Sequence, residues 1–201
     1  MMRKLPFVTL AILLLSGLVA TAQEQVGSAL IDGKKIKIFD DFSWQYASKT
    51  PSECQTISKQ LEFCGSSTRW RSTTVPSSDV SAVYRYDDRH YAMVIVEELG
   101  SADGVSLDFM RQAVLENAAA GAETRVEDVA VFESTDIEVA GFDATNIVYS
   151  VPINGLQLVY SNTIISQSNL TLQLITYEVG SQYQDFHRGI HQDFLSEMRI
   201  K

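Results

Sequence analysis

The chain is poor in the residues that most often mark a catalytic or metal site. Its 201 residues include two cysteines, three histidines and four prolines. Neither the G-x-S-x-G pattern of serine hydrolases nor the H-E-x-x-H pattern of zinc proteases occurs. The sequence therefore carries no catalytic signature, and we expect no catalytic residues, no metal ligands and no cofactor.

Basic residues are also scarce. Lys and Arg number 16 against 25 Asp and Glu, which gives a formal charge of −9. Binding to nucleic acid requires basic side chains that neutralise phosphates, and docking on anionic lipid requires basic segments. The composition therefore argues against both kinds of partner and favours solubility.

The first 22 residues have the pattern of a secretory signal peptide. Arg3 and Lys4 form a basic head, residues 8–15 are mostly apolar, and residues 20–22 match an A-x-A cleavage site. The apolar run is too short to favour a stable membrane span, and no cysteine lies near the cleavage point for lipid attachment. We expect cleavage after Ala22 and export to the periplasm or the medium. The mature chain then has 179 residues, with 14 basic against 25 acidic residues.

Cys54 and Cys64 are the only cysteines in the sequence. Because an exported protein meets oxidising conditions, we interpret the pair as a disulfide. Closing a loop of about 11 residues stabilises a fold by about 2.5–3 kcal/mol in the chain-entropy model. A redox pair is the alternative, but redox pairs usually have C-x-x-C spacing at the start of a helix.

Four parts are predicted along the chain. The signal peptide covers 1–22, a small β-hairpin module covers 23–47, and a Ser/Thr-rich linker with the disulfide loop covers 48–79. The α+β domain covers 80–201. Whether the N-terminal module packs on this domain stays open at this level.

The N-terminal module contains the segment DGKKIKIFDDFSWQY, residues 32–46. It resembles a short motif common near the start of exported bacterial proteins, roughly DG-[RK]-x-[VI]-x-L-x-DDGTW-x-Y, with Phe42 where the motif has glycine. Asp32-Gly33 predicts a hairpin turn. Trp44 and Tyr46 are candidate binding residues, but such aromatic side chains more often close the end of a small sheet.

Residues 80–201 have the hydrophobic pattern of an antiparallel sheet with helices. The clearest part is 144–179, where three alternating strands are joined by turns at Asn154-Gly155 and at 166–168. Helical periodicity marks 107–120 and 182–198. Further strands are expected at 80–86, 91–96, 126–132 and 137–140. The predicted fold class is α+β: an antiparallel β-sheet flanked by two main helices, preceded by the small N-terminal β-hairpin.

The ends of both helices carry recognisable signals. Ser106 is expected to cap the first helix and Gly121 to end it. Ser181 with Gln184 has the pattern of a capping box for the second helix. The buried stripe of this second helix is expected to contain Tyr183, Phe186, Ile190 and Phe194, and Gly189 suggests a close approach to the sheet.

The order of these elements, ββαβββββα, resembles the PsbP-like group. The resemblance covers about residues 61–200 and includes the segment LVYSNTIISQSNLTLQLITYEV, followed by a helix that begins near YQDF. The group contains extrinsic photosystem II proteins and bacterial DcrB-type envelope lipoproteins, which are mostly accessory or binding proteins. The resemblance therefore implies a PsbP-like sandwich. This chain lacks the lipid-anchor cysteine of the DcrB type, and no functional residues are transferred to it.

The three histidines are the candidates for chemistry. His187 and His191 lie four residues apart on the second helix, a spacing that suits two zinc ligands, but no third ligand is evident. We therefore favour two half-buried histidines at the seam between helix and sheet. His90 follows Asp87, Asp88 and Arg89, and such a charged hairpin tip is more often solvated than catalytic.

Three functions are compatible with these patterns. We favour a non-enzymatic accessory or binding protein of the bacterial envelope, which docks another envelope protein through its sheet edges or open face. The alternative is a carrier with a small-ligand pocket between the sheet and the C-terminal helix, lined by Tyr149, Tyr160 and Tyr177. An enzyme would need a cleft where His187 or His90 meets a carboxylate within hydrogen-bond reach.

Overall fold

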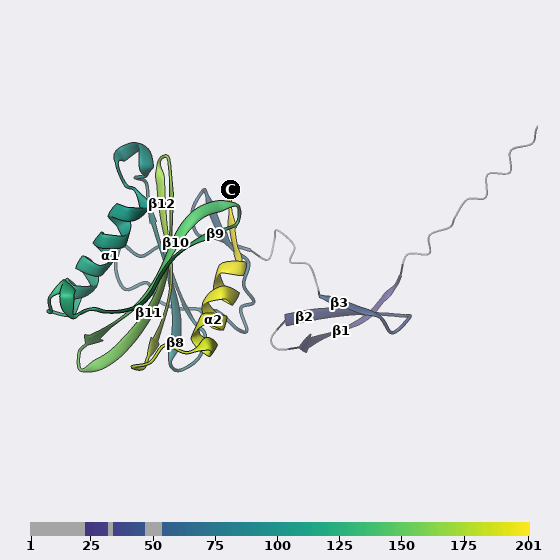
Figure 1. The fold of residues 1–201 in the computed structure, drawn as a ribbon. Helices are drawn as coiled ribbons and strands as arrows, with labels where there is room; N and C mark the ends of the chain where they lie inside the picture. The colour runs from purple at the N-terminus through teal and green to yellow at the C-terminus, as the bar shows by residue number, and fades with distance from the viewer. Residues whose placement is uncertain (1–22, 32–33, 47–53) are drawn as a thin grey trace, which may run out of the picture. The chain divides into compact units, whose positions relative to one another are not determined.

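The computed structural model describes residues 23–31, 34–46 and 54–201 (Figure 1). The predicted signal peptide and the Asp32-Gly33 turn lie outside the described residues. The chain divides into two compact units, the smaller within residues 1–47 and the larger containing residues 48–201. Within the described residues, no helix combines the length and the apolar character that a bilayer span requires.

The smaller unit is a three-stranded sheet in the order β1-β2-β3. Its strands are β1 (Gln25–Ile31), β2 (Lys34–Phe39) and β3 (Trp44–Tyr46). Phe42, in the turn between β2 and β3, has φ +63° and an exposed side chain. This left-handed backbone favours glycine, which explains why the motif that the segment resembles has glycine at this position.

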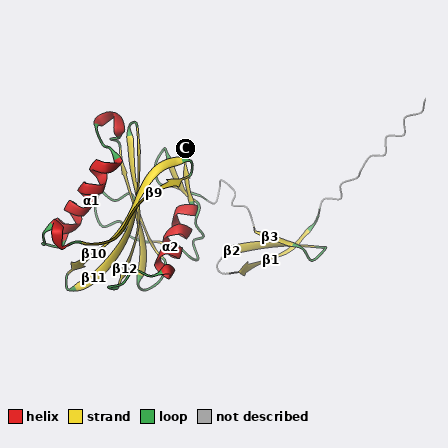
Figure 2. Cartoon of the chain, viewed as in Figure 1, coloured by secondary structure: helices red, strands yellow, loops and turns green. Residues whose placement is uncertain are grey.

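The larger unit is built on a seven-stranded antiparallel sheet (Figure 2). The strand order is β6-β7-β8-β12-β11-β10-β9. The strands are β6 (Arg71–Ser72), β7 (Ala82–Arg85), β8 (His90–Glu97), β9 (Ala130–Val139), β10 (Phe142–Ile153), β11 (Leu156–Gln167) and β12 (Leu170–Val179). The predicted α+β class, with an antiparallel sheet and two helices, is confirmed.

The predicted central meander is present as β10, β11 and β12. Asn154 and Gly155 have φ of +51° and +79°, the left-handed pair that a two-residue hairpin turn requires. The sequence predicts that the first strand stops at Pro152, but β10 continues to Ile153. Proline is tolerated there because β9 pairs with β10 only as far as Ser150. On the β9 side, no described strand pairs with Pro152.

The two helices lie on opposite faces of the sheet, one on each face (Figure 1). Helix α1 (Leu107–Gly121) packs on β10 and β11, and its buried Met110 and Val114 share a cluster with residues of those strands. Ser106 caps it as predicted, because its side chain accepts a hydrogen bond from the Phe109 backbone N–H at 3.1 Å. Helix α2 (Asp185–Ser196) packs on β12 from the opposite face, through Ile190 and Phe194.

Helix α2 differs from its sequence prediction at the N-terminus. Its N-cap is Gln184 rather than Ser181, and the helix begins three residues later than expected. The side chain of Phe186 is 57% exposed, so the buried stripe begins at Ile190. A Cβ on Gly189 would meet nothing within 4 Å, so the expected close approach to the sheet is also wrong.

Residues 55–72 contribute strands to two sheets, where the sequence predicts a linker. A second small sheet has the order β13-β5-β4, from β4 (Gln55–Thr56), β5 (Leu61–Phe63) and β13 (Met198–Ile200). The disulfide between Cys54 and Cys64 sits next to the paired residues Gln55 and Phe63, and so closes the end of the β4–β5 hairpin. The segment is held because it supplies large buried side chains to the core.

The strand boundaries within residues 126–140 also differ from the sequence prediction. The sequence predicts two strands at 126–132 and 137–140, whereas residues 126–128 form a short 3₁₀ turn and β9 is a single ten-residue strand. A β-bulge explains the difference. Val131 lies opposite Tyr149 and Glu133 opposite Val148, so Phe132 is an extra residue that interrupts the alternation along β9.

The core under α2 is centred on an aromatic cluster. Phe194 is fully buried, with its ring centroid 5.6 Å from that of Phe63, 5.0 Å from Trp70 and 6.2 Å from Tyr84. These four rings come from α2, β5, β7 and the loop before β6. The cluster therefore joins the small sheet, the edge of the large sheet and the C-terminal helix.

Replacing Phe194 with alanine should lower the free energy of unfolding by about 3–5 kcal/mol, since it leaves a cavity among rings that cannot close around it. Urea denaturation monitored by circular dichroism measures this change. Phe109→Ala on α1 is the matched control: its side chain is 58% exposed, so a loss within about 0.5 kcal/mol is expected. Equal losses in the two variants would contradict this description of the core.

Candidate functional site

The most polar buried cluster of the larger unit forms where β8 begins and β12 ends. His90 is the first residue of β8, and the antiparallel register places it directly opposite Glu178 of β12. His90 Nε2 lies 3.2 Å from Glu178 Oε2. Both residues are buried, with 9% and 3% of their surface exposed. His90 is therefore part of the interior, whereas the sequence predicts a solvated hairpin tip.

Asp87 holds the other nitrogen of the His90 ring. Its two carboxylate oxygens lie 2.7 and 2.8 Å from His90 Nδ1. The backbone N–H groups of Arg89 and His90 donate to the same carboxylate at 2.8 and 2.9 Å. These contacts lower the pKa of Asp87 although its partial burial opposes them. The charged carboxylate therefore fixes His90 with Nδ1 as a donor and Nε2 toward Glu178.

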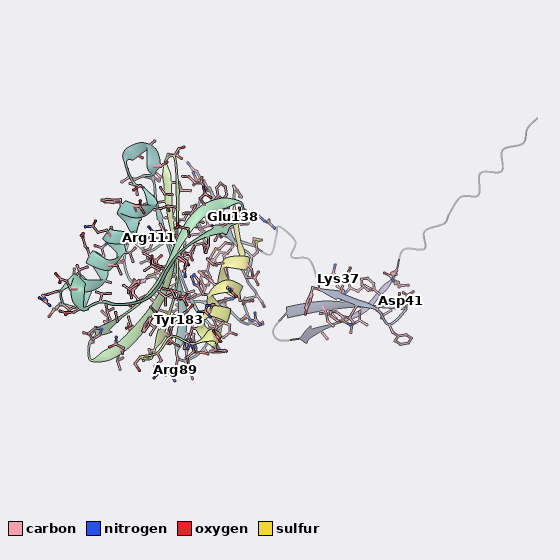
Figure 3. All side chains as sticks on the ribbon, in the orientation of Figure 1. Lys37, Asp41, Arg89, Arg111, Glu138 and Tyr183 are labelled. Atoms are coloured by element: carbon pink, nitrogen blue, oxygen red, sulfur yellow. A yellow bond between two sulfur atoms is a disulfide. The ribbon has the colours of Figure 1, made fainter. Side chains whose placement is uncertain are left out.

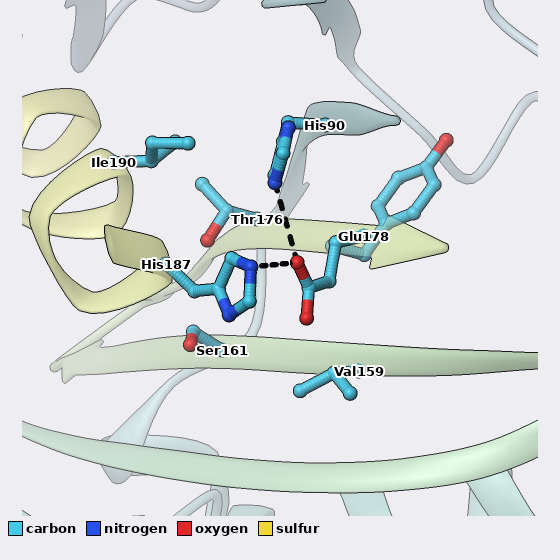
Figure 4. Close-up of a pocket in the computed structure, with 8 residues that line it drawn as sticks. His90, Val159, Ser161, Thr176, Glu178, His187 and Ile190 are labelled. Atoms are coloured by element: carbon cyan, nitrogen blue, oxygen red, sulfur yellow. Dashed lines mark hydrogen bonds and ion pairs between the residues drawn. The ribbon is translucent and has the colours of Figure 1, made fainter. Parts of the chain in front are cut away.

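Helix α2 brings a third side chain to this point. His187 lies in the first helical turn, and its Nε2 contacts the same oxygen of Glu178 that faces His90 (Figure 4). Its Nδ1 accepts a hydrogen bond from the Gln184 backbone N–H at 3.1 Å, which completes the helix cap. His187 therefore caps α2 with one ring nitrogen and meets Glu178 with the other.

Burial sets the electrostatics of the cluster. It raises the pKa of Glu178, and the nearby His90 and Arg89 oppose that shift. Burial also lowers the pKa of His187, and the neighbouring His90 and Arg89 side chains lower it further. The second oxygen of Glu178, Oε1, has no hydrogen-bond partner among the described residues.

The second histidine of α2 has a separate role. His191 is 4% exposed, and its Nδ1 and Nε2 each lie 2.8 Å from a threonine hydroxyl, of Thr176 and Thr163 respectively. The Thr163 hydroxyl donates to Asn146 Oδ1 at 3.0 Å, so Nε2–H must donate to Thr163 and the Thr176 hydroxyl to Nδ1. This arrangement satisfies a neutral ring, and burial lowers the pKa of His191 to about 3.

The structure thus separates the two histidines that the sequence places on one helix face. His187 meets Glu178 and His90, whereas His191 belongs to a neutral chain of hydrogen bonds inside the sheet–helix seam. Glu178 was missed as a member of the site because its role depends on strand register, whereas Asp87 contacts His90 locally, three residues along the chain. The approach of His90 to Glu178 needs the pairing of β8 with β12, which no local motif encodes.

An enzyme would need both a cleft and a histidine that meets a carboxylate, and the structure provides only the second. Two histidines do meet a carboxylate, but the cavity beside them has a volume of about 10 Å³. That volume holds one water molecule, whereas small-molecule sites usually measure about 300–1,000 Å³. The cluster can hold a proton, a water molecule or an ion.

The three tyrosines suggested as pocket residues lie on the other face of the sheet. Tyr149, Tyr160, Tyr177 and Tyr91 are cross-strand neighbours on β10, β11, β12 and β8 and stack in a row. The centroid distances are 5.2, 5.5 and 5.3 Å along this row. Tyr149 and Tyr160 pack in the α1 cluster, so a pocket lined by them between the sheet and the C-terminal helix is not present.

The two arginines labelled in Figure 3, Arg111 and Arg89, connect elements of the larger unit. Arg111 of α1 donates to Thr145 of β10 at 2.7 Å and to Asp136 of β9 at 2.6 Å. Arg89 donates twice to the Val179 carbonyl oxygen, at 2.6 and 3.1 Å. The first contact ties α1 to the edge of the sheet, and the second holds the turn that carries Asp87 and His90 against the end of β12.

Replacing His191 with glutamine should flatten the loss of stability in acid. The folded-state pKa of His191, about 3, is below the ordinary histidine value of 6.5, so the unfolded chain takes up the proton first as pH falls. Stability is full above pH 6.5 and is lost toward pH 3, by about 2 kcal/mol between pH 7 and pH 5 for this one group. Urea denaturation at the two pH values should show a smaller difference in the variant, and an unchanged difference would contradict the assignment.

No family model matches this sequence, and no curated protein matches it. Among solved structures, the chain is similar to the solution structure of cyanobacterial PsbP (CyanoP) from Synechocystis, with a TM-score of 0.52 and 12% identity. The similarity covers 71% of this chain and 87% of that one. The predicted resemblance to the PsbP-like group is therefore confirmed at the level of the fold.

Two further solved structures are similar at a lower level. LpqN, involved in cell envelope biogenesis of Mycobacterium tuberculosis, has a TM-score of 0.42 and 15% identity over 66% of this chain and 79% of LpqN. The Ran-binding protein Mog1p of Saccharomyces cerevisiae has a TM-score of 0.43 and 11% identity over 89% of this chain and 95% of Mog1p. Similarity at that level supports no inference about this chain. At 12% identity, the similarity to CyanoP shows the fold alone.

Proposed function

We propose that this protein is exported and acts as a non-enzymatic accessory protein of the bacterial envelope, which binds another protein. The signal-peptide pattern and the Cys54–Cys64 disulfide support export. The observation that carries the binding role is β9. This ten-residue strand ends the seven-stranded sheet and has a strand neighbour on one side only within the described residues.

The free edge of β9 suits the addition of a partner strand. A sheet edge offers unpaired backbone N–H and C=O groups, which proteins usually protect by making the edge short or covering it. Here the bulge at Phe132 leaves a regular stretch from Glu133 to Val139. Val131 and Phe132, just before it, are 46% and 43% exposed. Backbone pairing would supply affinity, and these apolar side chains would anchor one end of the partner.

The charge of the edge indicates the kind of segment that fits. Glu133, Asp136 and Glu138 lie on β9, which has no basic residue. Arg188 pairs with Glu133, and Arg111 pairs with Asp136. Glu138 is exposed, and the protein as a whole is acidic. We infer that the partner contributes an extended segment with a basic residue near Glu138 and an apolar residue near Phe132.

A photo-crosslinking amino acid at Thr135 should capture one dominant envelope protein in cells, because Thr135 is exposed in the middle of the regular edge. The Val131→Ser/Phe132→Ser variant should reduce this crosslink about tenfold or more, since anchor side chains carry most of an interface's energy. Mass spectrometry identifies the partner, and immunoblotting measures the yield.

The matched control is Val75→Ser/Leu99→Ser, which removes two comparably exposed apolar side chains elsewhere on the larger unit. Its crosslink should match the wild type. No reproducible partner from Thr135, or an equal loss in both double variants, would count against docking at β9.

A small-ligand carrier is the second candidate, and a groove on the α1 face of the sheet favours it. The groove has a volume of about 240 Å³ and an apolar floor that includes Met93, Ile95 and Ile175. Asn162 in the groove is 1% exposed, and its Oδ1 has no hydrogen-bond partner among the described residues. Its Nδ2 donates to Gln173 at 2.9 Å. A ligand with one polar donor and an apolar body would satisfy this site.

If the groove carries a ligand, native mass spectrometry of protein purified from cells should detect a retained small molecule. Ile95→Trp should abolish that retention because the larger side chain fills the groove. Val75→Trp, at an exposed position elsewhere, is the control and should keep the ligand. A bare chain in the native spectrum of the wild type, with the fold intact, would contradict the carrier function.

A further inference from the structure

Three side chains in the larger unit direct one donor atom each toward a common point. His90 Nε2, Glu178 Oε2 and His187 Nε2 lie within 4.8 Å of one another (Figure 4). Two imidazole nitrogens and one carboxylate oxygen form a donor set that binds zinc, with further positions left to water. We propose that His90, Glu178 and His187 bind one divalent transition-metal cation of the zinc class.

The spacing of the donor atoms suits such an ion. Ligands at about 2.0–2.2 Å from zinc in tetrahedral geometry lie about 3.3 Å from one another. His90 Nε2 and Glu178 Oε2 are 3.2 Å apart, and His187 Nε2 contacts the same oxygen. The His90–Glu178 distance matches this spacing, whereas His187 Nε2 lies closer to the oxygen than two ligands of one ion do, so the His187 ring must move away to admit the ion. The ligands come from β8, β12 and α2, so the cation would tie the helix to the two strands beneath it.

The supporting shell around His90 has the form that metal sites use. A metal-bound histidine usually donates its second ring N–H to a carboxylate or carbonyl group, which fixes the ring. Asp87 accepts from His90 Nδ1 at 2.7 Å and is itself held by two backbone N–H groups. This contact leaves Nε2, the nitrogen that faces Glu178, as the nitrogen available to a cation.

A proton or a cation is needed between His90 Nε2 and Glu178 Oε2. In a neutral His90 ring with its proton on Nδ1, the Nε2 lone pair faces the Glu178 carboxylate oxygen at 3.2 Å, which is repulsive. The Glu178 Oε1 atom is also buried and unpartnered among the described residues. A divalent cation would accept the lone pair of His90 Nε2 and neutralise the Glu178 carboxylate. A proton on His90 competes with the cation for this position.

Two features oppose binding and limit the affinity. His187 Nδ1 accepts from the Gln184 N–H, so coordination through Nε2 moves the ring proton to Nδ1 and breaks this cap contact. The Arg89 guanidinium lies close enough to act on both His187 and Glu178. Asp87 supplies a compensating negative charge beside His90. The site therefore takes the ion with a change in the first turn of α2.

The cavity at the cluster has room for about one water molecule or one ion. Its volume is about 10 Å³, and it is lined by Ser161 and Thr176 in addition to the three ligands. One water needs about 10–15 Å³, so the cavity admits a single occupant of that size. The ring of Phe186 lies 5.4 Å from that of His90 and partly shields the site from solvent.

The test uses purified protein without a polyhistidine tag, stripped of metal with EDTA. Titration calorimetry with Zn²⁺ should give one equivalent per chain, and Co²⁺ should produce the visible absorption of a four-coordinate N/O site. Glu178→Gln and His187→Gln should each weaken Zn²⁺ binding by on the order of a hundredfold or more, and Asp87→Asn by about 10–100-fold. Asp185→Asn, an exposed carboxylate in the same helical turn, is the matched control and should leave the affinity unchanged.

A second measurement covers the case in which a ligand variant fails to fold. In the ¹⁵N-edited imidazole NMR spectrum of the wild-type protein, Zn²⁺ should shift the ring signals of His90 and His187 and leave those of His191 in place. The proposal is overturned by the absence of saturable Zn²⁺ binding, by unchanged affinity in folded Glu178→Gln and His187→Gln, or by ring signals of His90 and His187 that Zn²⁺ does not move.

Discussion

The strand register of β12 with β8 and β11 is the constraint on which both faces of the large sheet depend. Glu178 pairs with His90, and the adjacent residue Tyr177 pairs with Tyr91 on one side and Tyr160 on the other. Because successive side chains alternate between faces, one register places the polar cluster under α2 and the tyrosine row on the α1 side. A slip of one residue would exchange the two faces, so the buried leucines of β12 hold the register.

The two faces are built differently because the helices cover different strands. On the α2 side, Phe194 and Ile190 pack into a cluster with the leucines of β12 and the rings of β5 and β7. On the α1 side, the helix covers β10 and β11 and leaves a groove over β8 and β12. One face therefore has a filled core with an ion-sized cavity at its margin, and the other has an open groove floored by apolar side chains.

Local patterns predicted most of the elements and marked His90 and His187 as candidates, but they did not identify Glu178 as the carboxylate that the two histidines meet. Asn154-Gly155, Ser106 and the alternation of β10, β11 and β12 encode their structures through nearest neighbours, so the sequence alone was sufficient for them. The Ser/Thr-rich segment does not reveal its own packing, because Leu61 and Phe63 are buried by partners far along the chain, such as Phe194 and Met198. The solvated placement of His90 was wrong for the same reason: its partner, Glu178, is brought to it by strand pairing across 88 residues of sequence.

The pairing of β5 with β13 has a consequence for the order in which the protein can fold. Phe63 is paired with Met198, so the small sheet joins segments from opposite ends of the larger unit. Contacts of such long sequence separation form slowly, because loop closure must precede the stabilising contacts. During synthesis, β5 emerges early and can pair with β4, whereas β13 follows only after all strands of the seven-stranded sheet. The small sheet, and the aromatic cluster that Phe63 shares with Phe194, can therefore be completed only when the larger unit has almost entirely emerged.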